Sequence, residues 1–238
     1  MDGRFSRTAR IFGADGMERL QSAHVAVFGV GGVGSYIAEG LARSGVGHIS
    51  LIDSDAVDIT NLNRQLEALS DTVGKPKAQA MRERILQINP ECEVIVHDCF
   101  FLPENSDSFD FTQYSYVADA VDTVTAKIEL VVKAQREGAP IISSMGTGNK
   151  LCPAMLEVSD IYKTSVCPLA RVMRQELKKR GVKRLKVVYS KEEPIQALES
   201  EEDNPHRRSI PASAVFVPGT AGLIIASEIV KDIVQHKA

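Results

Sequence analysis

The chain has 238 residues, of which 44% are hydrophobic and 25% are charged, and these values exclude a disordered or fibrous chain. Its formal net charge of −3 gives no overall signal for nucleic-acid binding, so any contact with RNA has to come from a local basic cluster. The length is most simply accounted for by one α/β domain that spans residues 1–238.

The cysteines and the longest apolar stretch bear on the compartment. Cys92, Cys99, Cys152 and Cys167 form no C-x-x-C pair, which argues against a Cys₄ zinc site. The amino terminus does not resemble a secretory signal, so we expect reduced thiols and a cytoplasmic protein. The apolar stretch 209–234 contains prolines, glycines and three charged residues, which favours a buried helix over a membrane span.

The first residues, 4–10, contain three arginines around one aromatic side chain. A stretch with so little apolar content is usually a solvated terminal arm, and this is our prediction. Residues 18–22 are predicted to form a short helix that leads into the first strand.

The stretch 24–53 has the order of a nucleotide-binding βαβ unit. A short run rich in β-branched residues, 24–28, is followed by a glycine turn, an amphipathic segment at 36–44 and a second apolar run at 48–52. The turn contains Gly29, Gly31, Gly32 and Gly34. Gly29 permits the tight turn, Gly31 lets the backbone approach a phosphate, and Gly34 lets helix and strand pack closely. The first turn of the helix then offers unpaired N–H groups to anionic oxygens.

An acid follows the second strand, because Asp53 lies 24 residues after Gly29, where a carboxylate can bind a ribose hydroxyl. The glycine motif alone fits NAD, FAD and ATP sites. The next residues discriminate better, because a polar loop brings Asn61, Arg64 and Gln65 back toward the phosphate end, and Lys77 follows. Cations near a phosphate-binding turn suit a triphosphate better than a nicotinamide, so the sequence favours ATP.

The middle of the chain alternates predicted helices and strands. We expect helices at 75–89 and 124–137 and strands at 93–97, 116–121 and 140–144. Such alternation predicts a mostly parallel sheet with ligands at the carboxyl ends of the strands. Asp53, Asp122 and the loop 143–149 should therefore meet at one edge.

Asp122 has two interpretations. Together with Thr123 it can cap the helix 124–137. Alternatively it is a magnesium ligand, since magnesium sites combine one or two carboxylates with phosphate oxygens. Asp55 and Asp58 are candidates to share that second role.

A basic segment follows. Residues 168–181 predict a helix on which Arg171, Arg174 and Lys178 share a face. Such a run is usually a solvated face. The sharper hypothesis is contact with the phosphate backbone of RNA. Beyond it we predict a strand at 186–190 and a mobile loop at about 191–211.

Taken together, these motifs resemble the ThiF/MoeB/HesA family, the adenylating relatives of ubiquitin-activating enzymes. The segments that carry the resemblance are 4–7, 29–35, 53–55, 61–65, 75–77 and 120–122. The missing zinc cysteines and the segments 160–164, 168–171 and 187–190 look like the tRNA threonylcarbamoyladenosine dehydratase branch. Cys167 stands where we expect an acid in that branch.

The resemblance implies a Rossmann-like, doubly wound α/β fold with helices on both faces, a mostly parallel sheet and a C-terminal extension. It implies an ATP- and Mg²⁺-dependent enzyme that adenylates the threonyl carboxylate of threonylcarbamoyladenosine in tRNA and cyclises it, releasing AMP and pyrophosphate. The implied catalytic residues are Arg7 from the neighbouring subunit of a homodimer, Arg64, Lys77 and Asp122, with Asp122 also the metal ligand. The implied nucleotide-binding residues are Gly29, Gly31, Gly32, Gly34, Asp53, Asp55, Asn61 and Gln65.

Two other functions stay open. The same ATP site could activate the carboxyl terminus of a small ubiquitin-like or sulfur-carrier protein, and related chemistry sometimes needs a sulfur-transfer-type protein partner. The third hypothesis is a dinucleotide-binding oxidoreductase or a nucleotide-sensing module, and Arg64 and Lys77 argue against it.

Overall fold

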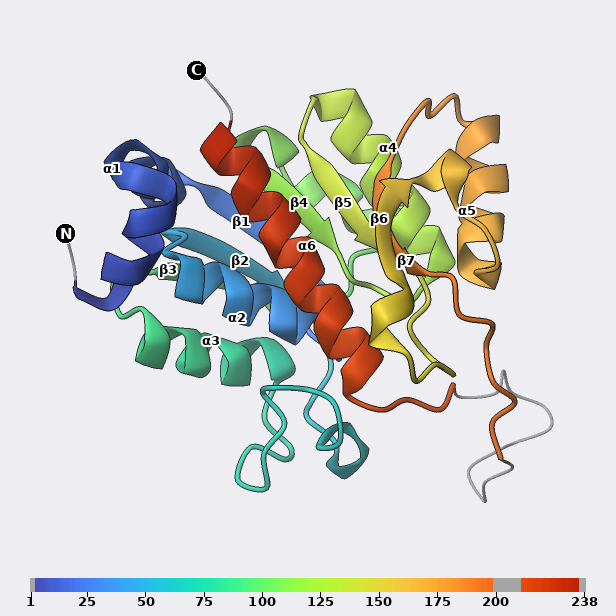
Figure 1. Cartoon of the computed structure of the whole chain (residues 1–238), viewed down its shortest axis with the longest axis horizontal. Helices are drawn as coiled ribbons and strands as arrows, with labels where there is room; N and C mark the ends of the chain where they lie inside the picture. Colours follow the sequence, from blue (N-terminus) through green and yellow to red (C-terminus); the bar gives the residue numbers. More distant parts are fainter. Residues whose placement is uncertain (1–2, 199–210, 236–238) are drawn as a thin grey trace.

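One seven-stranded sheet organises the described part of the chain, residues 3–198 and 211–235 of a computed structural model (Figure 1). The strand order is β3-β2-β1-β4-β5-β7-β6, and only β6 runs antiparallel to its neighbour. The strands are β1 His24–Phe28, β2 His48–Ile52, β3 Glu93–His97, β4 Tyr116–Asp119, β5 Ile141–Ser144, β6 Leu156–Asp160 and β7 Lys186–Ser190. The order reverses between β1 and β4, which is where doubly wound proteins bind their ligands.

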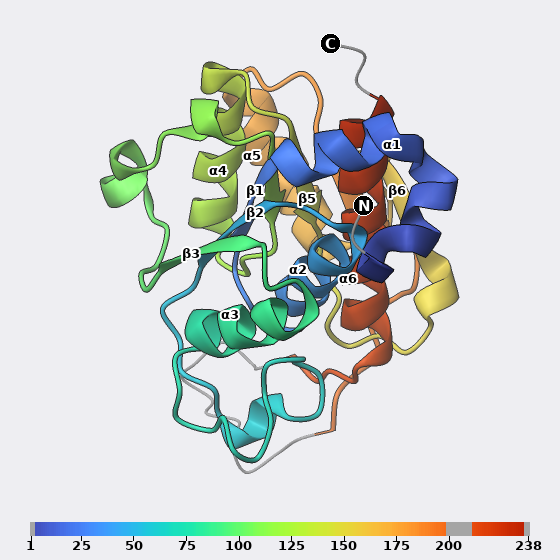
Figure 2. The same ribbon diagram turned by 90° about the vertical axis from the view of Figure 1, so that its left-hand side faces the viewer.

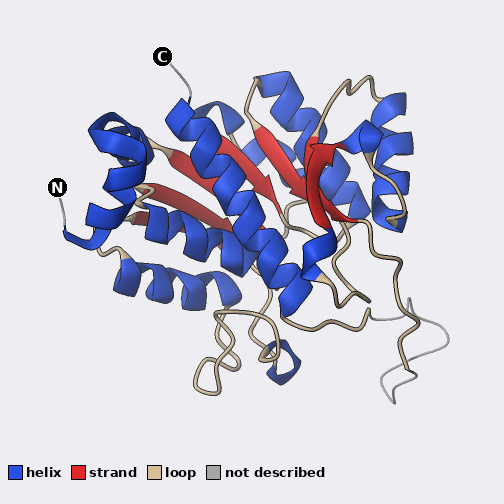
Figure 3. Cartoon of the chain, in the orientation of Figure 1, coloured by secondary structure: helices blue, strands red, loops and turns tan. Residues whose placement is uncertain are grey.

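Helices cover both faces of the sheet, as Figures 2 and 3 show. One face carries α1 (Ser6–Ser22), α2 (Gly34–Ser44), α3 (Lys77–Ile88) and α6 (Phe216–Gln235), and the other carries α4 (Val124–Glu137) and α5 (Pro168–Lys179). Side chains of β1 alternate between the two layers: Val25 and Val27 pack with the first group, Ala26 and Phe28 with the second. The predicted doubly wound α/β fold is confirmed.

The apolar stretch near the carboxyl end forms α6, a helix that packs on α1 and α2. Its buried positions include Val217, Ala221, Ile225, Ile229 and Ile233, which recur at helical spacing. This confirms the buried helix. Within residues 3–198 and 211–235, every helix is too short or too polar to cross a membrane.

The amino-terminal residues are not a solvated arm, so that prediction is wrong. They form a helical turn, Gly3–Phe5, and the helix α1, which kinks at Gly13, where φ is 73°. Phe5, Ala9 and Phe12 pack against the core. These three side chains recur at i, i+4 and i+7, so one face of the helix is apolar although the arginines dominate the composition.

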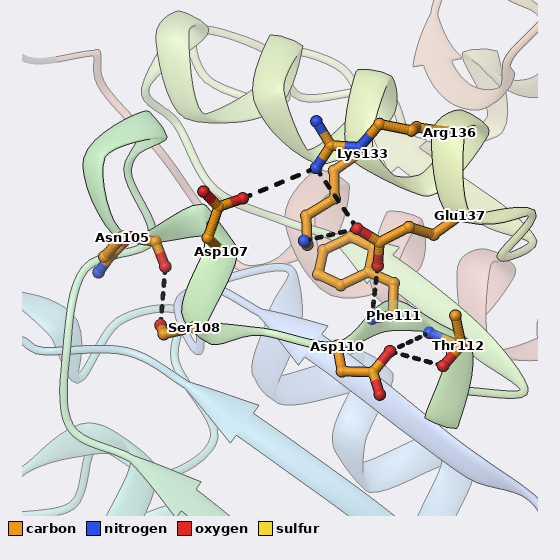
Figure 4. A network of polar contacts seen from close by, with 9 residues as sticks. All are labelled: Asn105, Asp107, Ser108, Asp110, Phe111, Thr112, Lys133, Arg136 and Glu137. Atoms are coloured by element: carbon orange, nitrogen blue, oxygen red, sulfur yellow. Dashed lines mark hydrogen bonds and ion pairs between the residues drawn. The ribbon is translucent and has the colours of Figure 1, made fainter.

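A polar network ties the loop after β3 to the far end of α4 (Figure 4). The loop contains two short 3₁₀ helices, Pro103–Ser108 and Phe111–Gln113. Glu137 accepts a hydrogen bond from the Phe111 N–H at 2.9 Å and pairs with the buried Lys133 at 2.7 Å. A carboxylate in α4 thereby anchors a segment that has no regular hydrophobic period.

Two features after residue 150 differ from expectation or extend it. The edge strand β6 was not predicted, and it pairs antiparallel with β7. Of the predicted mobile loop, residues 191–198 have no regular structure but are bonded to the loop after β5: Glu192 accepts the N–H groups of Leu151 and Cys152, each at 2.9 Å. Residues 199–210 lie outside the described residues.

Candidate nucleotide-binding site

The predicted site residues gather at the carboxyl edge of the parallel strands. The glycine turn follows β1, Asp53 follows β2, Asp122 follows β4, and the loop 145–149 follows β5. Because β1, β2, β4 and β5 are mutually parallel, all four segments leave the sheet at the same edge. The expected meeting of these segments is therefore confirmed.

The glycine turn is built so that only glycine fits at two of its positions. Gly29 has φ +85°, and a Cβ atom there would lie 2.8 Å from the Ala120 carbonyl oxygen. A Cβ atom on Gly34 would lie 1.8 Å from the Gly29 oxygen. The helix α2 begins at Gly34, and no side chain caps it. The Ser35 N–H donates to the Gly31 carbonyl at 3.0 Å, so the N–H groups of Gly34 and Tyr36 are the ones in the first turn that can bind an anion.

The loop after β2 returns to this turn, as predicted. A Cβ atom built on Gly31 would lie 3.7 Å from Gln65 Nε2, and one on Gly32 would lie 3.5 Å from Arg64 Cγ. Gln65 is only 8% exposed, and its Oε1 atom is buried without a hydrogen-bond partner among the described residues. Leaving such an acceptor unpaired is costly. The uncrowded backbone at Gly31 and the unpaired Gln65 acceptor beside it fit a nucleotide.

Asp53 connects the end of β2 to the glycine turn. Its Oδ2 accepts the Val30 N–H at 2.7 Å and its Oδ1 accepts the Asp55 N–H at 2.8 Å. Burial raises the pKa of the Asp53 carboxyl, although these two hydrogen bonds oppose the rise. A carboxylate has about four lone-pair sites, so acceptor capacity is left for ribose hydroxyls. Asn61 has a structural contact as well, since its Oδ1 accepts the Asp58 N–H at 3.1 Å.

Lys77 is held by Asp55. Its ammonium lies 2.8 Å from Asp55 Oδ2, and its N–H donates to the Asp55 carbonyl at 2.8 Å. The Lys77 side chain is 9% exposed. Binding a phosphate would therefore require Lys77 to share or exchange this partner. Asp58 is used locally, because its Oδ1 accepts the Thr60 N–H at 2.8 Å.

The cap interpretation of Asp122 is wrong. Thr123 is the residue that precedes α4, and no side chain caps that helix. Asp122 is exposed, and within residues 3–198 and 211–235 its carboxylate has a single weak contact, with Thr123 Oγ1 at 3.4 Å. Among the described residues, no cluster of three or more histidine, cysteine or acidic side chains could hold a metal. One free carboxylate at this edge fits Mg²⁺, which is bound by one or two carboxylates together with phosphate oxygens.

Arg7 is separated from the other predicted residues. The Phe5 ring lies beside Gly45, where a Cβ atom would be 3.5 Å from Phe5 Cδ1, and Gly45 caps the carboxyl end of α2. The glycine turn lies at the other end of that eleven-residue helix, about 16 Å away. Arg7 itself is exposed and makes no hydrogen bond or ion pair with another residue in the described part of the chain.

The basic face predicted on α5 is divided. Arg174 is partly buried and donates to the Thr164 carbonyl at 3.0 Å, so it holds the preceding loop. Arg171 and Lys178 are exposed. Farther along, Lys179 and Arg180 pair with Glu176 at 2.6 Å and 2.7 Å. Arg171 and Lys178 remain the better candidates for RNA contact.

Two features near the site, Glu67 and the pair Lys127–Asp119, escaped the sequence reasoning, and the structure explains a third, Cys167. Glu67 is 2% exposed, and both its carboxylate oxygens lack a hydrogen-bond partner among the described residues. Lys127 and Asp119 form a fully buried pair. Cys167 is buried in the α4–α5 core, which accounts for an uncharged side chain there. Neither Glu67 nor Lys127 belongs to a recognisable motif. A lysine on the apolar side of the predicted helix 124–137 could nevertheless have indicated a buried charge that needs a partner.

The fold and this edge define a nucleotide-binding α/β protein with a Rossmann-like sheet. The family model described as "ThiF family" matches residues 5–238, and the chain belongs to the ThiF family.

Three comparisons place the chain more closely. It is 45% identical over 240 residues to the tRNA threonylcarbamoyladenosine dehydratase of Bacillus subtilis, covering 97% of this chain and 94% of that protein. The structure of the Escherichia coli tRNA N6-threonylcarbamoyladenosine dehydratase in complex with ATP is 38% identical, with a TM-score of 0.86 over 97% of this chain and 93% of that chain. The AMP complex of the same enzyme has a TM-score of 0.88, with the same identity and coverage.

Proposed function

We propose that this chain is an ATP-dependent, AMP-forming tRNA threonylcarbamoyladenosine dehydratase. It adenylates the threonyl carboxylate of the modified adenosine and cyclises it, with a net loss of water and release of AMP and pyrophosphate. The proposal is carried by the glycine turn and the acidic and basic residues at the carboxyl edge of the parallel strands, in a chain that is similar to such an enzyme over nearly its whole length.

The chemistry needs a leaving group, because a carboxylate is a poor electrophile. One carboxylate oxygen attacks the α-phosphate of ATP and displaces pyrophosphate. The carbamoyl group then closes onto the activated carbonyl and displaces AMP, so no protein nucleophile is required. The N–H groups of Gly34 and Tyr36 at the start of α2 and the Arg64 guanidinium hold phosphate oxygens. Asp53 holds the ribose.

Mg²⁺, when bound, neutralises charge that develops on the phosphates. Asp122 would hold it, since this carboxylate is exposed at the edge and is not used as a helix cap. Asp55 orients the Lys77 ammonium before binding, and Lys77 shifts from Asp55 toward the phosphates as the triphosphate arrives.

The active form is a homodimer in which Arg7 serves the partner's site. Arg7 is exposed on α1, whose Phe5 packs at the carboxyl end of α2, about 16 Å from the glycine turn of the same subunit. A guanidinium can bridge two phosphate oxygens. Arg64 then acts in its own subunit, and Arg7 acts across the interface.

The substrate is tRNA, and the exposed cations of α5, Arg171 and Lys178, contact its phosphate backbone. A tRNA substrate places the activity in the cytoplasm. A sulfur-transfer-type protein partner stays a prediction. Turnover measured with and without such a protein tests it.

The experiment that tests the function is ATP–pyrophosphate exchange with two alternative acceptors. We expect stimulation by tRNA that carries threonylcarbamoyladenosine and loss of one water from the modified nucleoside by mass spectrometry. Unmodified tRNA is the matched control. Stimulation by a ubiquitin-like or sulfur-carrier protein, and none by the modified tRNA, would instead support the carrier-activating alternative.

A further inference from the structure

A fully buried ion pair lies at the end of β4. The side chains of Lys127 and Asp119 are both 0% exposed, and Lys127 Nζ lies 3.0 Å from Asp119 Oδ1. The Ser143 hydroxyl, on the neighbouring strand β5, donates to Asp119 Oδ2. Burying two opposite charges costs desolvation, and an apolar pair often stabilises a core equally well. Stability alone is therefore a weak explanation for this pair.

The pair binds both polar backbone groups of Val121. The Val121 N–H donates to Asp119 Oδ1 at 3.3 Å, and Lys127 Nζ donates to the Val121 carbonyl at 2.9 Å. On the opposite side, the Ala120 N–H donates to the Phe28 carbonyl at 2.8 Å. A Cβ atom on Gly29 would lie 3.0 Å from Val121 N, so the backbone of the glycine turn passes close to this residue and leaves it no room to move toward the turn.

The next residue is Asp122, whose carboxylate is exposed and almost without partners. Its backbone is thus fixed on one side by the buried pair and on the other by the glycine turn, while its side chain stays free. A metal ligand needs this combination, because partners behind a ligand set its orientation and tune its affinity.

We propose that Lys127 and Asp119 are positioning residues that aim Asp122 at Mg²⁺ and the nucleotide phosphates, with Ser143 orienting Asp119. This inference rests on the proposed function in one respect, the role of Asp122 as the Mg²⁺ ligand. Lys127 and Asp119 touch neither metal nor nucleotide, and act through the Val121 peptide.

The test replaces the two charges by neutral side chains of similar shape, in the double variant Lys127→Met/Asp119→Asn. Asparagine keeps one acceptor oxygen for the Val121 N–H, and its NH2 group can donate to the Ser143 hydroxyl. The lysine contact to Val121 is lost. The matched control is Lys133→Met/Glu137→Gln on the same helix (Figure 4). That pair is less deeply buried, with side chains 3% and 20% exposed, and its two charges are 2.7 Å apart. It also holds a backbone N–H, but it lies at the opposite end of α4.

Calorimetry measures ATP affinity with Mg²⁺ and with a chelator, in the absence of RNA. We expect the double variant to bind ATP in chelator within about threefold of the wild type, because α2 and Asp53 are unchanged. The gain in affinity on adding Mg²⁺ should shrink by roughly 10- to 100-fold. The control pair should retain the full gain.

A folded double variant with a wild-type Mg²⁺ response would overturn the proposal and leave the pair a purely structural role. If the double variant does not fold, Ser143→Ala decides, since it removes one contact to Asp119 and keeps both charges. We expect it to weaken the Mg²⁺ response by about threefold, and an unchanged response overturns the proposal. A wild-type protein without any Mg²⁺ response overturns it too, whereas failure of the tRNA reaction alone overturns only the proposed function.

Discussion

Glu67 should make the stability of this protein fall as the pH rises through neutrality. Burial raises the pKa of its carboxyl from 4.5 to about 8, and the nearby Lys77 ammonium offsets only part of this. Between these two values the native state keeps a proton on Glu67 that the unfolded chain has released. The native state therefore binds more protons, and its free energy of unfolding decreases with rising pH.

The magnitude follows from the linkage between proton binding and folding. Each pH unit inside the interval costs the native state about 1.4 kcal/mol, so the whole interval corresponds to roughly 5 kcal/mol as an upper bound. That bound is comparable to the total stability of a small domain. The stabilising effect of the raised pKa is complete below pH 4.5 and is lost by about pH 8.

The substitution Glu67→Gln removes the titration and keeps the shape of the protonated acid. We expect the free energy of unfolding of the variant minus that of the wild type to increase by about 1 kcal/mol per pH unit between pH 6 and 8. Urea titrations followed by circular dichroism at a series of pH values measure this difference. Other titrating groups, such as His24 and His97, contribute equally to both proteins and cancel.

Glu91→Gln is the matched control, because Glu91 is an exposed glutamate. The difference between its free energy of unfolding and that of the wild type should stay constant across the same pH range. If Glu67→Gln also stays parallel to the wild type, the buried carboxyl is ionised in the native state at neutral pH, and the reasoning from burial is refuted.

Three further predictions concern the site. Asp122→Asn should lower ATP–pyrophosphate exchange by on the order of 100-fold without changing the melting temperature; full exchange in the folded variant would deny the carboxylate a role. Arg171→Glu/Lys178→Glu should weaken tRNA binding at low salt and leave ATP affinity unchanged, and it should reduce the slope of log affinity against log salt concentration by roughly two. Wild-type tRNA affinity in a filter-binding assay would mean that this face of α5 does not contact the RNA. Arg7→Ala and Arg64→Ala should each be inactive, while mixed dimers recover about half of the activity, since one site of two carries both arginines; no recovery after confirmed subunit exchange would mean that Arg7 does not act across the interface.

The residue pattern alone predicted much of the sheet and of the glycine turn. The strands at 24–28, 48–52, 93–97 and 186–190 have the bounds expected from their apolar runs, and α4 has both expected ends. The expected end of β4 was two residues too late, and β6 was missed. The first helix was recognised only at its carboxyl end, because arginines hid an apolar stripe formed by Phe5, Ala9 and Phe12.

The sequence by itself determined the βαβ unit, the acid after β2 and the meeting of Asp53 and Asp122 at one edge, because helical and strand periods are local and parallel strands share an edge. Only the tertiary structure decided how individual side chains are used. It showed that Asp122 is free rather than a cap, that Arg174 holds Thr164, and that Lys127 is buried against Asp119. These outcomes depend on which distant segment lies opposite each side chain, and therefore on the strand order and the packing of helices, which no local period of the sequence encodes.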